Sequence, residues 1–153
     1  MILDNINYSN TSRYLPSRKD KKYFEQILIH IDFKGAPPKF EFLMDFVKFF
    51  GENKIITGFL MEFEDTLPYK GNLECIRADR SSEKCYTESQ IKKLVKLIKD
   101  LNLKIVPLVQ VFSHLEYVLK RNQFKDLREE PEKMLSLCPL KEGSIELVLE
   151  IIN

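Results

Sequence analysis

The sequence lacks the glycine-rich loops with which many α/β proteins bind phosphate groups. Neither a GxGxxG nor a GxxxxGK pattern follows any apolar segment that we expect to be a strand, which disfavours a nucleotide-binding function. The chain also lacks an apolar run of membrane-spanning length, and its opening residues, MILDNINYSN, contain no apolar core of the kind found in signal peptides. These absences favour an intracellular protein without a signal peptide and without a membrane partner.

Cysteine is scarce as well, with three residues among 153. Cys75, Cys85 and Cys138 lie far apart, form no CxxC pair and are odd in number, so we expect reduced thiols rather than disulfides or zinc ligands. The formal net charge is only +1, which gives no indication of a nucleic acid or other polyanionic partner. The length and the 44% apolar content suit one soluble domain with a sizeable core.

The segment 104–120, KIVPLVQVFSHLEYVLK, contains the most informative pattern in the chain. Its apolar first part predicts a strand over Lys104–Val109, buried on both faces as in a parallel sheet that is covered by helices. Polar residues gather where this strand should end, among them Gln110, Ser113 and His114, and helical spacing of the apolar residues follows. Because α/β folds place their active sites at the carboxyl ends of parallel strands, this is the expected functional edge.

Two similar units precede this segment. In the first, the period of two over Ile27–Asp32 places His30 and Asp32 on one face of a strand. We interpret His30 as a strand histidine with a structural partner. Apolar residues at helical spacing then predict a helix over Lys39–Phe50, with Gly51 as its C-terminal stop.

The second unit is expected to begin with a strand over Ile56–Glu62. Further along, Thr87 and Gln90 form a capping box, which predicts the start of an amphipathic helix. The last helix is predicted over Ser144–Ile152. Three acids crowd the end of the second strand: Glu62, Glu64 and Asp65.

The elements follow the order β-α-β-α-β-α, which predicts an α/β fold with parallel strands because crossovers of this kind are right-handed. Two architectures fit: an open doubly wound sheet, and the first part of an eight-stranded β/α barrel, which normally needs roughly 250 residues. Residues 1–24 are rich in Asn, Ser and basic side chains and are expected to form a disordered arm. Residues 25–153 then form the folded domain.

Three linked segments carry a resemblance to a known family: HIDFKGAPPKF, EFEDTLPYKG and VPLVQVFSHLEYVLK. In order and spacing they resemble the opening segments of glycoside hydrolase family 20, and more narrowly its nucleocytoplasmic branch without a signal peptide. The resemblance implies a TIM-type (β/α)8 barrel of which this chain holds about three β/α units and stops before the fourth strand. It also implies the removal of terminal N-acetylhexosamines from glycoconjugates in the cytoplasm, the nucleus or both.

The chemistry implied by this resemblance is substrate-assisted glycoside hydrolysis, in which the acetamide oxygen of the sugar attacks the anomeric carbon. The family carries an Asp-Glu pair for this reaction at the end of its fourth strand. No Asp-Glu dipeptide occurs in this sequence, so no catalytic residue of that kind is expected in the chain.

Three functional interpretations therefore remain open. The first is a β-N-acetylhexosaminidase of which this chain is an N-terminal portion. The second is a truncated, non-catalytic part of a barrel that at most binds sugar or associates with a partner, including another copy through its open sheet edges. The third is an unrelated open α/β binding domain whose match to the family is accidental.

His114 matches the family's histidine after the third strand, and the resemblance implies that it supports the general acid through a carboxylate relay. Glu62, Glu64 or Asp65 would orient it. Without the resemblance, a structural histidine that caps the following helix would be the ordinary interpretation.

The resemblance also indicates which residues would contact the sugar. Asp32 matches the acid of the first strand, and Gln110 stands where many members carry Asp. Ile27 replaces an arginine that many members use to bind sugar hydroxyls, and Lys34 is a candidate substitute. The expected substrate-binding residues are Asp32, Lys34, Tyr69 and Gln110.

No metal or other cofactor is expected. The pairs His30-x-Asp32 and His114-x-Glu116 match no strong metal-ligand pattern.

Overall fold

The computed structural model describes residues 24–78 and 84–153. The expected disordered arm, residues 1–24, lies outside the described residues except for Phe24, so it stays a prediction. Within the described ranges, none of the helices has both the length and the apolar character needed to cross a bilayer.

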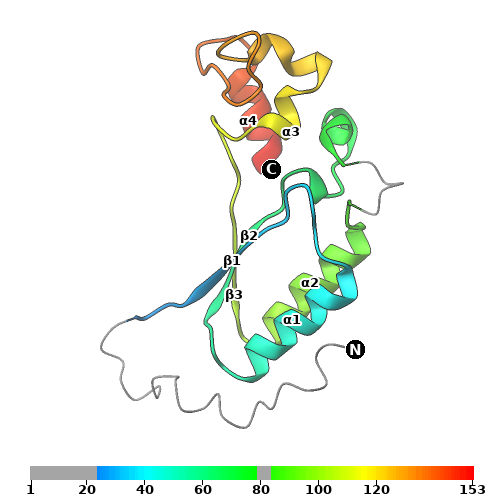
Figure 1. Ribbon diagram of the computed structural model, residues 1–153, viewed down its shortest axis with the longest axis vertical. Coiled ribbons are helices and arrows are strands. Elements are labelled where there is room, and N and C mark those ends of the chain that lie inside the picture. Colours follow the sequence, from blue (N-terminus) through cyan, green and yellow to red (C-terminus); the bar gives the residue numbers. More distant parts are fainter. Residues whose placement is uncertain (1–23, 79–83) are drawn as a thin grey trace.

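The sheet has three strands, β1 (Leu28–Asp32), β2 (Gly58–Glu62) and β3 (Lys104–Pro107), in the order β1-β2-β3. Both pairs are parallel, and Gly58 of the central strand lies beside Leu28 on one side and Lys104 on the other. The predicted parallel sheet with strands adjacent in chain order is therefore confirmed. Figure 1 shows that all three strands run toward the part of the molecule that contains α3 (Glu116–Leu119) and α4 (Ser144–Ile152).

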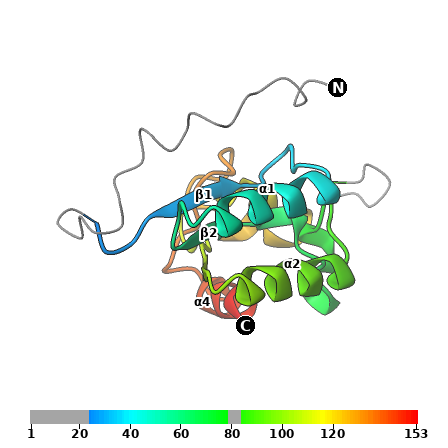
Figure 2. The ribbon, with the colours of Figure 1, turned by 90° about the horizontal axis from the view of Figure 1, so that it is seen from below.

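Helices α1 (Phe40–Glu52) and α2 (Glu88–Asp100) pack side by side against one face of the sheet, as the two views of Figures 1 and 2 show. This arrangement follows from the sequence, because each helix has an apolar stripe and the strands alternate. The fully buried side chains of this first core are Phe33, Leu43, Val47, Phe59, Met61, Leu94 and Ile98.

The opposite face of the sheet is open in the described part of the chain. Leu28 and Val106 lie on that face and remain 36% and 37% exposed. The expectation that Lys104–Val109 is buried on both faces is therefore wrong, since helices cover only one. An apolar run indicates a strand that can be buried on both sides, but it does not supply the second layer.

A second hydrophobic core lies at the carboxyl ends of the strands (Figure 1). The short helix α3 and the longer α4 build it, together with the 3₁₀ helix Gly71–Ile76. The range predicted for the last helix matches α4, whereas the helix expected after His114 is a single turn. The buried residues of this second core are Leu73, Ile76, Leu115, Tyr117, Val118, Leu119, Leu137, Leu147 and Ile151.

The start of α2 confirms the predicted capping box. The Thr87 hydroxyl accepts a hydrogen bond from the Gln90 backbone N–H at 3.2 Å, and the Thr87 backbone N–H donates to Gln90 Oε1 at 2.8 Å. These two bonds satisfy N–H groups that the first turn of a helix leaves without partners.

The prediction that Gly51 stops α1 is wrong, because the helix continues to Glu52 and Lys54 adopts the left-handed conformation with φ of +54°. Gly51 instead allows close packing, since a Cβ atom there would lie 2.8 Å from Leu101 Cδ1.

Gly58 has a similar role under a tighter constraint. A Cβ atom at this position would lie 2.4 Å from the backbone oxygen of Lys104, which belongs to the neighbouring strand and cannot turn away. We expect Gly58→Ala to lower the free energy of unfolding by about 3 kcal/mol, because β2 and β3 would have to separate.

The control is Gly51→Ala, whose closest neighbour is the end of a flexible leucine side chain. Its cost should be about 1 kcal/mol or less, because the gain in helix propensity offsets part of the crowding. Urea denaturation of both variants measures the difference, and equal losses would contradict the role assigned to Gly58.

Candidate functional site

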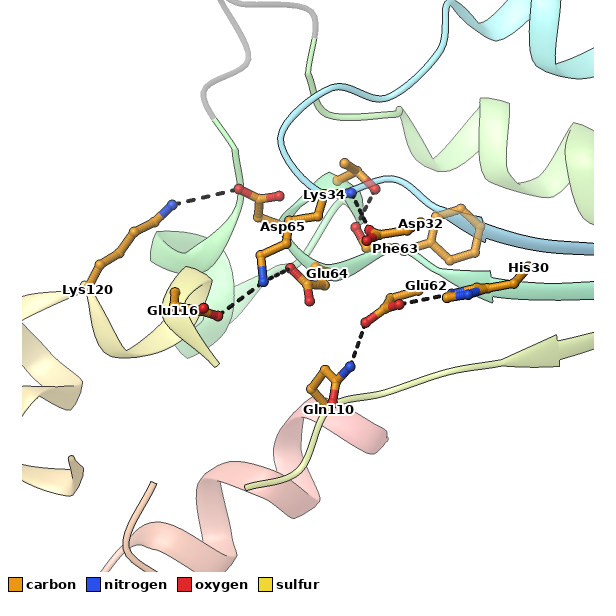
Figure 3. A network of polar contacts seen from close by, with 11 residues as sticks. His30, Asp32, Lys34, Glu62, Phe63, Glu64, Asp65, Gln110, Glu116 and Lys120 are labelled. Atoms are coloured by element: carbon orange, nitrogen blue, oxygen red, sulfur yellow. Dashed lines mark hydrogen bonds and ion pairs between the residues drawn. The ribbon is translucent and has the colours of Figure 1, made fainter. Parts of the chain in front are cut away.

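The carboxyl ends of the three strands gather a set of polar side chains (Figure 3). Asp32 and Glu62 are the last residues of β1 and β2 and are register partners, so the parallel sheet places them side by side. Gln110 follows β3 and reaches the same edge. Asp32 and Glu62 end neighbouring strands and Gln110 follows the third, although long helical connections separate them in the sequence.

Glu62 is the centre of the first part of this edge. Its side chain is buried, with Oε2 at 2.9 Å from His30 Nε2 and Oε1 accepting a hydrogen bond from Gln110 Nε2 at 2.6 Å. One carboxylate thus joins β1, β2 and the segment after β3, as the dashed lines in Figure 3 show. The structural partner expected for His30 is therefore Glu62.

Lys34 is the centre of the second part. Its backbone N–H donates to Asp32 Oδ1 at 2.8 Å, which fixes the turn after β1. Its ammonium group donates to Glu116 Oε2 at 3.0 Å and lies 3.4 Å from Glu64 Oε2. A single cation therefore connects the loops that follow β1, β2 and β3 (Figure 3).

Glu64 is unusual in its burial and its backbone. The residue is only 5% exposed, and Oε2 has no hydrogen-bond partner, because the Lys34 ammonium contacts it as a charge at 3.4 Å without hydrogen-bond geometry. Burial raises the pKa of its carboxyl group to about 7, while Lys34 opposes the shift and the nearby carboxylates of Glu62 and Asp32 add to it.

The backbone of Glu64 is left-handed, with φ of +45°, and so is that of His114, with φ of +58°. The other non-glycine residues of this kind in the described chain are Lys54 and Asn102, which follow the C-termini of α1 and α2, where this conformation terminates helices. Glu64 and His114 have no such helix-ending role. Strained backbone at non-glycine positions is concentrated at functional sites.

The third acid of this group, Asp65, lies 3.8 Å from the ammonium group of Lys120 through its Oδ2 atom. Tyr69 is half-buried against the second core, beside the hydroxyl group of Tyr117. Burial raises the pKa of Tyr69 to about 12 and that of Tyr117 further, so both hydroxyl groups stay protonated.

His114 lies exposed in the loop between β3 and α3. Among the described residues, no hydrogen bond or ion pair joins it to Glu62, Glu64 or Asp65, each of which contacts another side chain. The relay role of His114 therefore stays a prediction. In residues 24–78 and 84–153, no group of three or more His, Cys, Asp or Glu side chains could hold a metal ion.

The sequence predicts sugar binding by Lys34 and names no partner for His30. Their partners are far away along the chain: Glu62 lies 32 residues after His30, and Glu116 lies 82 residues after Lys34. The local signal is the charged or polar residue at the end of each strand. It indicates which edge of the sheet carries the site but not which side chains pair there.

The raised pKa of Glu64 predicts how stability depends on pH. Between about pH 4.5 and pH 7 the folded protein keeps a proton that the unfolded chain has lost, so the free energy of unfolding should fall as the pH rises. Glu64→Gln cannot ionise and should lack this decline. Relative to the variant, the wild type should lose about 1 to 3 kcal/mol between about pH 5 and about pH 8.

Urea denaturation of both proteins across this range measures the difference, and the comparison cancels groups that titrate equally in each. Parallel stability profiles would show that the Glu64 carboxyl group is not held protonated.

Comparison with known proteins gives two relatives of high similarity. Over 129 residues the chain is 40% identical to hexosaminidase D of Bos taurus, a match that covers 82% of this chain and 35% of the bovine protein. Over 133 residues it is 38% identical to hexosaminidase D of Homo sapiens, covering 85% of this chain and 26% of the human protein. The chain thus spans about a third and a quarter of these relatives. No protein-family model matches it.

Solved structures show the same relation at the level of the fold. The β-N-acetylhexosaminidase of Streptomyces coelicolor A3(2) superimposes with a TM-score of 0.67 at 12% identity, over 85% of this chain and 30% of that one. The exo-β-N-acetylglucosaminidase of Vibrio harveyi, solved in complex with N-acetylglucosamine, gives 0.63 at 14% identity, over 85% and 25%. The N-acetyl-β-hexosaminidase of Streptomyces plicatus gives 0.61 at 14% identity, over 85% and 30%.

These structures confirm the predicted fold, a three-stranded parallel α/β unit that corresponds to part of a TIM-type barrel. The sequence identity to the two hexosaminidase D proteins is higher than to these three structures, and it extends over most of this chain. We conclude that the chain is similar in sequence to part of hexosaminidase D and similar in fold to part of the glycoside hydrolase family 20 enzymes.

Proposed function

We propose that this chain takes part in the hydrolysis of terminal N-acetylhexosamines and binds the sugar at the carboxyl edge of its sheet. The observation that carries the proposal is the meeting of Asp32, Glu62 and Gln110 at that edge, in a chain 40% identical to hexosaminidase D. The similar enzyme from Vibrio harveyi was solved with N-acetylglucosamine, a sugar of the proposed substrate class. Because the match covers 35% or less of the relatives, the activity itself is part of the proposal.

The residues at this edge suit an uncharged sugar that is rich in hydroxyl groups. Asp32 is exposed and offers carboxylate oxygens as acceptors for sugar hydroxyls. Gln110 is held by Glu62 through its amide nitrogen, so its carbonyl oxygen can accept from the acetamide N–H. We assign these contacts to Asp32 and Gln110. We also propose that Lys34 and Tyr69 belong to the sugar site. His114 is proposed to support the proton donor.

The proton donor itself is not among these residues in this proposal. The sequence contains no Asp-Glu dipeptide, and residues that position a substrate do not replace a group that protonates the leaving oxygen. These residues should therefore bind N-acetylhexosamine without hydrolysing its glycosides. We further propose a cytoplasmic or nuclear location, which is supported by the free thiols of Cys75 and Cys138.

The proposal predicts weak, selective binding without turnover. N-acetylglucosamine should bind with a dissociation constant in the millimolar range, about 4 kcal/mol of binding free energy, whereas glucose, which lacks the acetamide, should bind more weakly. Asp32→Asn should weaken binding about tenfold, because it removes a charged acceptor. Titration followed by NMR measures the affinities, and a chromogenic N-acetylglucosaminide tests for turnover.

The matched control is Asp45→Asn, which makes the same change at an exposed position of α1, away from the strand ends. Equal affinity for glucose and N-acetylglucosamine would contradict the proposal. Turnover well above background would show that a proton donor is present after all.

A second candidate function is a non-catalytic role in which the chain associates with a partner or with a second copy. It is favoured by the open face of the sheet, where Leu28 and Val106 are exposed, and by the two strand edges of β1 and β3. Unpaired backbone groups at such edges can pair with another strand, so association would not require the sugar site.

If association dominates, the apparent mass should rise with protein concentration in size-exclusion chromatography with light scattering. Val106→Lys places a charge on the open face and should restore the monomer. A monomer at all concentrations would contradict association with a second copy and leave sugar binding as the better proposal.

A further inference from the structure

Within the described residues, Lys34 is the cation whose ammonium group contacts both Glu64 and Glu116. Its ammonium group lies 3.4 Å from Glu64 and 3.0 Å from Glu116, and its backbone is tied to Asp32. These contacts connect the turn after β1 with the 3₁₀ helix Glu64–Thr66 and with α3. Figure 3 shows the ammonium group between the two carboxylates.

The contact between Lys34 and Glu64 matters because Glu64 is buried among groups that do not stabilise its negative charge. Its side chain is 3% exposed, whereas that of Lys34 is 35% exposed, so the cation covers the acid from the solvent side. The other groups that influence its charge are acids or protonated hydroxyls, and none of them stabilises a carboxylate by its charge. These groups are Asp32 of β1, Glu62 of β2, Tyr69 and Tyr117.

The backbone gives an independent indication. Glu64 holds a left-handed conformation that glycine would adopt at less cost, and it places a carboxyl group in a buried position with one oxygen lacking a hydrogen bond. Stability alone does not explain such a residue, because both the backbone and the buried carboxyl group cost free energy. A functional requirement for the acid at this position does explain it.

We propose that Lys34 is a positioning residue of the sugar site, whose ammonium group holds Glu64 and Glu116 and thereby joins the loops that follow all three strands. The inference rests on the sugar-binding function proposed above, and it assigns Lys34 a role through Glu64 instead of a direct bond to the sugar. Without the ammonium group, Glu64 would be an isolated buried acid beside two carboxylates. It would then keep its proton to a higher pH or leave its position.

The test follows the ionisation of Glu64 and the affinity for N-acetylglucosamine in the same samples. In Lys34→Met, the Glu64 carboxyl group, observed by carbon-detected NMR, should titrate about one pH unit higher than in the wild type. Affinity for the sugar at about pH 7 should fall about tenfold. Lys34→Arg keeps the positive charge and should stay within about half a pH unit of the wild type.

Lys120→Met is the matched control, because Lys120 contacts the neighbouring Asp65 at 3.8 Å but not Glu64. It should change neither the Glu64 titration nor the affinity by more than about twofold. If Lys34→Met does not fold, Lys34→Gln keeps hydrogen bonding without the charge and serves in its place.

A double-mutant cycle separates positioning from direct contact. In the Glu64→Gln background, Lys34→Met should weaken binding less than about twofold further, because the residue through which it acts is already neutral. An undiminished tenfold loss would mean that Lys34 binds the sugar itself and would overturn the proposal. An unchanged Glu64 titration in Lys34→Met would overturn it as well.

The sugar-binding function has its own readout. If the wild type does not bind N-acetylglucosamine while Lys34→Met still shifts the Glu64 titration, the proposed function is wrong but the link between the two side chains stands.

Discussion

The site depends on partners for the acidic side chains that a parallel sheet brings together. Adjacent strands of equal direction end at one edge, so Asp32, Glu62 and Glu64 are neighbours although they come from two different units of the chain. Neighbouring carboxylates repel one another when they are ionised, and burial increases the free-energy cost of ionising them. His30 lies beside Glu62 and Lys34 lies beside Glu64, so each of these two acids has a partner at the strand ends.

Local patterns in the sequence were sufficient for the elements and their order. Alternation over Ile27–Asp32, the capping box at Thr87 and the apolar stripe of Ser144–Ile152 each depend on neighbours a few residues away. The ion pairs could not be read in this way, because the contact between Lys34 and Glu116 exists only after two crossovers have closed. The sequence indicated which residues reach the edge but not which of them pair.

Glycine illustrates the same limit at a smaller scale. Gly51 follows the apolar stripe of α1, a position where glycine usually ends a helix. Here the helix continues, and Gly51 lies against Leu101. Gly58 has an ordinary strand conformation, and no pattern in the sequence distinguishes it. The backbone of Lys104 nevertheless leaves no room for a side chain there. Both roles are set by residues that are distant in sequence, so periodicity and propensity cannot reveal them.

The residues of the site are held by elements that belong to two different hydrophobic cores. Glu62 and His30 stand on the sheet and its first core, whereas Glu116 begins α3, whose side chains pack into the second. The segment between β3 and α3 contains no helix or strand (Figure 1). Elements packed in different clusters can open as separate cooperative units. The contact between Lys34 and Glu116 therefore joins an element of the first core to an element of the second, and the geometry of the strand-end edge depends on how both cores are packed.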